Sequence, residues 1–226
     1  MRVAALYDIH GNVPALEAVL ADVERAGVDE IVWGGDVAAG PMPAETLARM
    51  RAVGGRCVSG NADREMIHDT RLGPADRAYL AAFEPTVSLD IDGLGETLFC
   101  HGSPRSDEEV ITRATPDERF APMVEGVDER VIVCGHTHQQ FDRRLAGRRV
   151  VNAGAVGMPY EGIVAAFWAV LGPEVDLRRT YYDVAPLIET LSPDDREMLH
   201  ESLIEPVDPE WVTQYFESGV APSDQP

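Results

Sequence analysis

The chain has 226 residues, 45% of them hydrophobic, and its 19 basic and 39 acidic side chains give it a formal net charge of −20. This length allows one large domain or two small ones with a sizeable core. The negative charge repels a phosphate backbone and disfavours anionic membrane surfaces, so we expect neither stable nucleic-acid binding nor membrane attachment.

The three cysteines, Cys57, Cys100 and Cys134, are widely spaced in apolar runs and form no Cys-x-x-Cys pair. This pattern is typical of reduced core residues. The apolar stretch in the N-terminal "MRVAALYDIHG" is too short for a signal peptide, and no apolar run is long enough to span a membrane. We therefore expect a cytoplasmic location.

The first part of the chain alternates apolar runs with helical patterns. The predicted elements are a strand at 3–7, a helix from the N-cap Asn12 to Gly27, a strand at 31–33, a helix at 43–53 and a strand at 56–59. Strands that alternate with helices predict a parallel sheet, whose ligands gather beyond the carboxyl ends of the strands.

The second part of the chain is richer in strands. A helical patch at 74–83 is followed by strands at 87–91, 97–100 and 131–134, a hairpin turning at Ala146-Gly147, and strands at 165–171 and 175–182. This order predicts two sheets packed face to face with helices outside. We expect a core domain at 1–184 and a helical extension at 185–226 packed on it, ending in a disordered "VAPSDQP".

Seven potential metal ligands follow apolar runs in five segments. They are Asp8, His10, Asp36, Asn61, His101, His136 and His138. Each alone is more often a helix cap or a core residue, but seven at one sheet edge would leave buried charge unpaired without a cation. Imidazole, carboxylate and amide donors suit first-row divalent ions, and seven donors exceed what one such ion takes. The set predicts two ions that share a bridging carboxylate.

Five blocks carry a resemblance to a known family. In order, "DIHGN", "GGD", "SGNAD", "CHG" and "CGHTH" resemble the D-x-H, G-D, G-N-H-[DE], H and G-H-x-H blocks of the calcineurin-like metallophosphoesterase superfamily. "VVNAGAVGMP" resembles a further block of its small bacterial phosphodiesterase (YfcE-like) branch. The resemblance covers residues 1–182 and implies an α/β fold, a four-layer αββα sandwich of two mixed sheets flanked by helices.

The resemblance also implies roles for the ligands. It places Asp8, His10 and His138 on one metal and Asn61, His101 and His136 on the other, with Asp36 bridging. Mn²⁺ is the first expectation, with Fe²⁺, Zn²⁺, Ni²⁺ and Co²⁺ as alternatives. The nucleophile is then a metal-bridging hydroxide, because a metal lowers the pKa of its bound water. Asp36, Asn61 and His101 are catalytic in this sense, through the metals and the hydroxide.

One position departs from the family pattern. The family commonly has a histidine near the leaving group where this chain has Ala62, and a positioned general acid is worth roughly 10²–10⁴-fold in rate for a poor leaving group. Substrates with acidic leaving groups are therefore favoured. Asp63 and His68 are weak candidates for a replacement acid, and Asp63 is more readily explained as a helix cap.

Asn12, Asn61 and Arg105 are candidate contacts for a substrate phosphate, although Asn12 also fits an N-cap and Arg105 a solvated loop. The hypothesis is a dinuclear metal-dependent phosphodiesterase that acts on a small or nucleotide-like phosphoester, as a monomer or a homo-oligomer. The alternatives are a phosphomonoesterase or protein phosphatase, and a non-catalytic scaffold such as the retromer subunit that resembles this superfamily.

Overall fold

The fold is organised by strands whose two faces are both buried. In the computed structural model, which describes residues 1–219, β1 (Val3–Leu6) directs Val3 and Ala5 toward one apolar cluster and Ala4 and Leu6 toward another. Successive side chains of a strand point to opposite faces, so β1 has an apolar layer on each side. It is therefore a central strand between two layers.

Each of the two sheets has five strands. The first has the order β10-β9-β1-β2-β3, with β2 at Glu30–Trp33, β3 at Arg56–Cys57, β9 at Ala166–Leu171 and β10 at Val175–Thr180. The second has the order β4-β5-β6-β8-β7, at Thr86–Ile91, Gly95–Cys100, Val131–Cys134, Arg148–Asn152 and Phe141–Leu145. Both mix parallel and antiparallel pairs: β1 is parallel to β2 and antiparallel to β9, and β6 is parallel to β5 and β8. The predicted two mixed sheets are confirmed.

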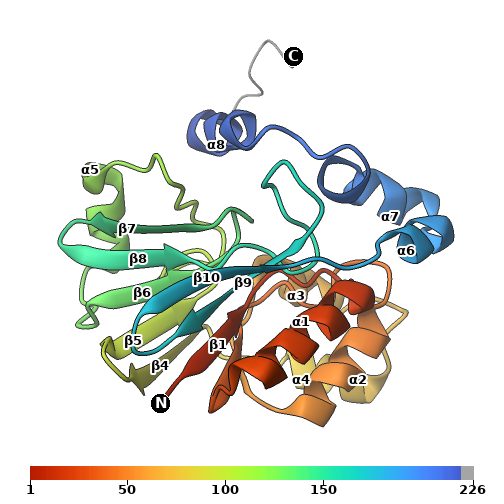
Figure 1. The fold of residues 1–226 in the computed structure, drawn as a ribbon, viewed down its shortest axis with the longest axis horizontal. Helices are drawn as coiled ribbons and strands as arrows, with labels where there is room; N and C mark the ends of the chain where they lie inside the picture. Colours follow the sequence, from red (N-terminus) through yellow and green to blue (C-terminus); the bar gives the residue numbers. More distant parts are fainter. Residues whose placement is uncertain (220–226) are drawn as a thin grey trace.

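Helices cover the two outer faces (Figure 1). On the first sheet lie α1 (Val13–Ala26) and α2 (Pro43–Val53), which share an apolar cluster with β1 and β2. Short α3 (Asn61–Met66) and α4 (Pro74–Leu80) lie beside them. The second sheet is covered by α5 (Asp117–Phe120) and a 3₁₀ turn at Ala121–Val124. The apolar cluster between the sheets completes the four-layer sandwich.

Most of the predicted elements form within two residues of their expected bounds. Asn12 caps α1 through a 3.1 Å hydrogen bond from the Ala15 N–H, and Gly27 ends that helix in a left-handed conformation. The third strand is shorter than expected, since only an isolated bridge at Val58 continues β3. The hairpin turn at Ala146-Gly147 is confirmed between β7 and β8.

The chain after residue 184 folds back over the sandwich. It forms α6 (Ala185–Thr190), α7 (Pro193–Met198), a π-helical segment at His200–Ile204 and α8 (Pro209–Ser218). An apolar cluster around Leu199 and Leu203 packs on Met42 and Met158 of the core. The expected disordered end at 220–226 lies outside the described residues. Within residues 1–219, no helix has the length and apolar character needed to cross a membrane.

Candidate metal centre

Six of the seven predicted ligands come together where strands of both sheets end, and Asn61 precedes Ala62, whose N–H bonds to Asp36. Asp8 and His10 follow β1, Asp36 follows β2, Asn61 begins α3, His101 follows β5, and His136 and His138 follow β6. Because β1 is parallel to β2 and β5 to β6, their carboxyl ends meet at one edge of the sandwich. The topology therefore collects residues that lie as far apart in the chain as positions 8 and 138.

The donor atoms form two groups that could each hold a metal ion. Asp8, His10 and His138 form the first group, and Asp36, His101 and His136 form the second. Within each group the donor atoms lie within 4.8 Å of one another.

The two groups face one another through their carboxylates. Oδ2 of Asp36 lies 3.4 Å from Nε2 of His101 in its own group and 3.9 Å from Nε2 of His10 in the other. Oδ1 of Asp8 likewise lies 3.4 Å from Nε2 of His138 and 3.9 Å from Nε2 of His101. Each of the two carboxylates therefore lies near imidazoles of both groups.

Backbone carbonyls orient three of the imidazoles. Nδ1 of His10 lies 3.0 Å from the Ala39 carbonyl oxygen, and Nδ1 of His138 lies 2.6 Å from that of Met158. Nδ1 of His101 lies 2.9 Å from the carbonyl oxygen of Gly34. A carbonyl can only accept, so each Nδ1 carries a proton and each Nε2 is turned toward the centre as the donor atom.

Three buried polar atoms at this centre have no hydrogen-bond partner: Oδ1 of Asp8, Oδ1 of Asn61 and Nε2 of His101. A buried polar atom without a partner costs about 1–3 kcal/mol. Oδ1 of Asp8 and Nε2 of His101 lie only 3.9 Å apart, which fits a cation site, because a metal bound there would satisfy both atoms. The donor set thus suits the divalent ions that the sequence predicts.

The loops that carry the ligands have a costly backbone conformation. Asp8, His10, Asp36, His136 and His138 all have positive φ, between 47° and 64°. The left-handed region costs a non-glycine residue roughly 1–2 kcal/mol, and such residues cluster at functional sites. Interloop hydrogen bonds compensate, with the N–H groups of Asp8 and His10 each donating at 3.0 Å to the loop after β2.

Gly60 is required by the close approach of two loops. A Cβ at this position would lie 2.2 Å from Oδ1 of Asp36 and 2.5 Å from its backbone nitrogen. Any side chain here would push Asn61 away from the centre. The "SGN" of the sequence is thus explained by packing as well as by the ligand that follows the glycine.

The carboxylates and imidazoles of the centre interact strongly in the metal-free protein. Burial disfavours the imidazolium form of His101, but the Asp36 and Asp8 carboxylates outweigh it and raise its pKa to about 10. Burial also disfavours ionised Asp36, and the imidazoles of His101 and His10 outweigh this and lower its pKa. Burial, together with the positive charge of His101, lowers the pKa of His136 to about 4, which leaves a neutral ring. The metal-free centre thus holds carboxylates and one imidazolium, whose Nε2 proton a bound metal would displace.

The weaker site candidates have other contacts. Both oxygens of the buried Asp63 carboxylate accept backbone hydrogen bonds, at 2.8 Å from Asp36, 3.0 Å from Val37 and 3.1 Å from Gly60. This side chain therefore fixes the two ligand loops against each other. His68 is exposed in the turn after α3.

The candidate phosphate contacts are engaged within the protein. The amide of Asn12 donates to the Gly157 carbonyl at 3.0 Å and to the Tyr182 hydroxyl at 2.9 Å, while its oxygen caps α1. The guanidinium of Arg105 forms a bidentate pair with Glu109. Neither side chain has a donor directed at the metal centre in this arrangement.

Two aromatic residues beside the centre have no counterpart among the sequence predictions. The ring of Tyr160 stacks on His138, with centroids 5.0 Å apart and planes at 16°, and Phe216 of α8 lies 6.5 Å from His136. Tyr160 directly follows the "VVNAGAVGMP" block, whereas no spacing or motif marks Phe216, whose position depends on how the C-terminal segment folds back.

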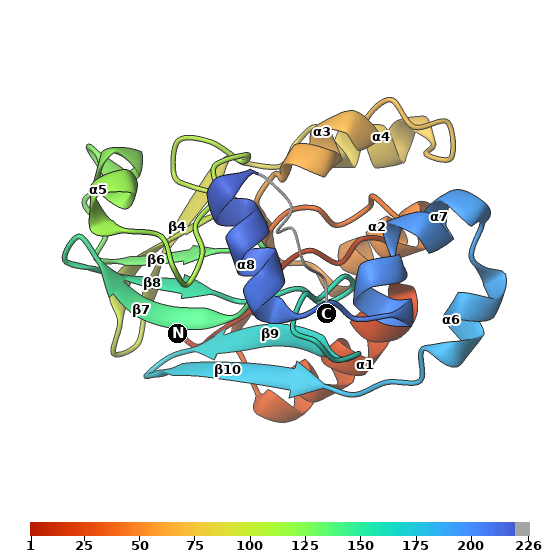
Figure 2. The same cartoon turned by 90° about the horizontal axis from the view of Figure 1, so that it is seen from above.

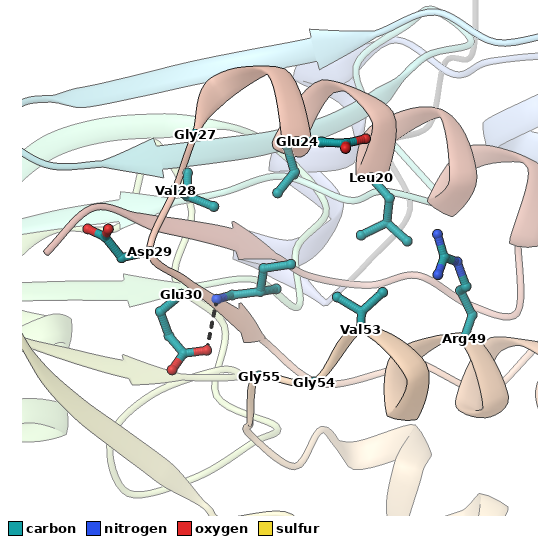
Figure 3. A pocket seen from close by; sticks show the side chains of 12 residues that line it. Leu20, Glu24, Gly27, Val28, Asp29, Glu30, Arg49, Val53, Gly54 and Gly55 are labelled. Atoms are coloured by element: carbon teal, nitrogen blue, oxygen red, sulfur yellow. Dashed lines mark hydrogen bonds between the residues drawn. The ribbon is translucent and has the colours of Figure 1, made fainter.

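A separate pocket of about 450 Å³ lies away from this centre (Figure 3). Its lining includes Leu20 and Glu24 of α1, Arg49 and Val53 of α2, and Glu30 at the start of β2. Asp36 follows the opposite end of that strand. The pocket is therefore no part of the candidate site.

Several known proteins are similar to this chain. An uncharacterized protein of Methanocaldococcus jannaschii, MJ0912, is 23% identical, over 84% of this chain and 91% of its own. The structure of a metallophosphoesterase from Sphaerobacter thermophilus has a TM-score of 0.74 at 26% identity and covers 90% of this chain and 99% of that chain. That of YfcE, a phosphoesterase from E. coli, has a TM-score of 0.52 at 24% identity, over 75% of this chain and 87% of that one, which shows the fold alone.

The model of the calcineurin-like phosphoesterase superfamily domain matches residues 1–171. The match spans most of the chain and includes all seven predicted ligands. The chain belongs to the calcineurin-like phosphoesterase superfamily.

Proposed function

We propose that this protein is a dinuclear metal-dependent phosphoesterase that hydrolyses phosphodiesters. The observation that carries the proposal is that two donor groups face one another and that Oδ1 of Asp8 and Nε2 of His101, one from each group and 3.9 Å apart, are buried without a hydrogen-bond partner. One ion would be held by Asp8, His10 and His138 and the other by Asn61, His101 and His136, with Asp36 shared.

Divalent ions bound there would acidify water and offset the charge that develops on the phosphate oxygens. The chain's own residues prepare the site for this chemistry. The carbonyls of Ala39, Met158 and Gly34 hold three imidazoles in the metal-binding tautomer. Asp63 keeps the loops of Asp36 and Asn61 at a fixed separation, so little reorganisation is needed on binding.

The preference for diesters rests on the position beside Asn61. Ala62 has no proton to donate to a leaving group, the Asp63 carboxylate is directed at three backbone N–H groups, and His68 is exposed. Without a general acid, an enzyme favours substrates whose leaving group departs as a stable anion. We infer a small diester substrate with an acidic leaving group, and Mn²⁺ as the first metal to test.

The test uses protein loaded in turn with Mn²⁺, Fe²⁺ and Zn²⁺, with bis(4-nitrophenyl) phosphate and 4-nitrophenyl phosphate as a matched diester and monoester. We expect a higher kcat/KM for the diester, and loss of at least about 10³-fold in Asp36→Asn, since the shared carboxylate is removed. A wild type that binds two ions per chain and hydrolyses neither ester would overturn the proposal.

A further inference from the structure

Helix α8 lies beside the metal centre, where Phe216 is near His136. In both views it crosses the edge of the sandwich where the strands of the two sheets end (Figures 1 and 2). Its residue Phe216 lies 6.5 Å, between ring centroids, from both His136 and Tyr160. Tyr160 in turn stacks on His138. Two aromatic rings from separate segments thus stand beside one imidazole of each donor group.

The position of α8 is fixed at its beginning by a residue of the ligand loop. Gln139, which directly follows His138 and is buried, donates to the carbonyl of Pro209 at 2.7 Å and to that of Tyr160 at 3.0 Å. Its amide oxygen accepts a 2.8 Å hydrogen bond from the hydroxyl of Thr213. One side chain therefore ties α8 and the Tyr160 segment to the metal loop.

The other end of α8 is fixed by Glu217. One oxygen of this carboxylate accepts hydrogen bonds from Thr112 at 2.5 Å, Thr115 at 2.9 Å and Arg119 at 2.5 Å, all in the segment that covers the second sheet. Phe216 is the neighbouring residue, so this anchor also fixes the position of its ring relative to His136. Helix α8 is therefore held in position by hydrogen bonds at both ends.

Binding metal ions does not require apolar side chains, yet two aromatic rings lie beside this site. Phe216 and Tyr160 are half-buried, so each keeps part of its surface open. A protein with a net charge of −20 gains little long-range attraction for a phosphate. Contact with the uncharged part of a ligand is then an efficient source of affinity, and planar rings stack well on aromatic side chains.

We propose that Phe216 and Tyr160 are specificity-determining residues that form an aromatic wall beside the metal centre and select phosphoesters carrying a planar aromatic ring, such as a nucleobase. This inference rests on the proposed function for the location of the phosphate. It adds the class of substrate and assigns the C-terminal helix, which lies beyond the matched family model, a direct part in recognition.

The test measures binding rather than turnover. AMP and ribose 5-phosphate carry the same phosphoryl group and differ by the base, so calorimetric titration of both into the metal-loaded protein isolates the contribution of the ring. We expect the wild type to prefer AMP by about tenfold, within the range known for base stacking on aromatic residues. Phe216→Ala should remove most of that preference and leave the affinity for ribose 5-phosphate within about twofold.

Two matched variants separate stacking from packing. Phe216→Leu keeps apolar bulk against His136 and should lose the preference, whereas Phe216→Trp keeps a ring and should retain it. Equal affinities of wild type for AMP and ribose 5-phosphate, or a preference that survives in both Phe216→Ala and Phe216→Leu, would overturn the inference. A Phe216-dependent preference for AMP in a protein that hydrolyses no ester would instead count against the proposed function alone.

Discussion

The backbone N–H of Ala62 donates a 2.8 Å hydrogen bond to Oδ1 of Asp36, the carboxylate between the two donor groups. Position 62 thus contributes its backbone to the centre, and its methyl group is the only part that a substitution changes. Ala62 is half-buried at the start of α3, next to Asn61. A larger side chain can therefore be introduced there while the contact to Asp36 is kept.

Ala62→His should raise kcat for alkyl phosphodiesters more than for aryl phosphodiesters. An imidazole beside the leaving group can protonate a poor leaving group, an effect worth about 10²–10⁴-fold at best, and a nitrophenolate needs no such help. We expect an increase of about tenfold for a methyl ester and less than twofold for the nitrophenyl ester. Equal effects on both esters would mean that position 62 does not face the leaving group.

Asp63→Asn separates a positioning role from an acid role. The variant places an amide NH₂ against backbone N–H groups that now donate to a carboxylate, so we expect the free energy of unfolding to fall by about 3 kcal/mol. The matched control is Asp76→Asn, since Asp76 occupies the same place in α4 but accepts one backbone hydrogen bond, at 3.2 Å from Gly73, beside an ion pair with Arg51 at 2.6 Å. The control should lose about 1 kcal/mol. An Asp63→Asn protein of unchanged stability and reduced kcat for alkyl esters would instead indicate an acid.

The clustering of the candidate ligands could be predicted because its signal is local. Asp8 and His10, like His136 and His138, directly follow buried strands, and parallel strands bring their carboxyl ends to one edge. The aromatic wall could not be predicted in this way. Phe216 lies beside the centre because hydrogen bonds to Gln139 and from Thr112 to Glu217 hold α8 in place. Such long-range hydrogen bonds leave no periodic pattern in a sequence.

The left-handed backbone conformation of these residues could not be predicted from the sequence either. Glycine marks such positions when it is present, but Asp8, Asp36 and His136 adopt them as non-glycine residues. The strain is tolerated because neighbouring loops hold these residues in place. The sequence shows which candidate ligands are present. The backbone conformation that orients their side chains depends on contacts between loops, which the sequence does not show.

Arg105→Ala should have little effect on catalysis. The guanidinium is half exposed and paired with Glu109, and exposed pairs contribute about 0–1 kcal/mol. We expect KM for the nitrophenyl diester to change by less than twofold. Glu109→Gln is the informative partner variant, because it frees Arg105 from its ion pair. A tenfold rise in KM in Arg105→Ala, with a fall in KM in Glu109→Gln, would establish Arg105 as a phosphate contact.

Metal affinity should rise steeply with pH through His101. In the metal-free protein its pKa is raised to about 10, so below that pH its Nε2 carries a proton that an incoming ion must displace. His136, with a pKa lowered to about 4, is already neutral. One displaced proton predicts an apparent affinity for Mn²⁺ that rises about tenfold per pH unit between pH 6 and pH 8.

Calorimetry in two buffers of different ionisation enthalpy measures this proton directly, and we expect about one to be released per chain near pH 7. His101→Asn should weaken binding and abolish the pH dependence, since an amide has no proton to lose in this range. His68→Asn is the control, because His68 is exposed outside the centre and should leave both quantities unchanged. Affinity that stays constant from pH 6 to pH 8 would show that His101 holds no proton between the two carboxylates.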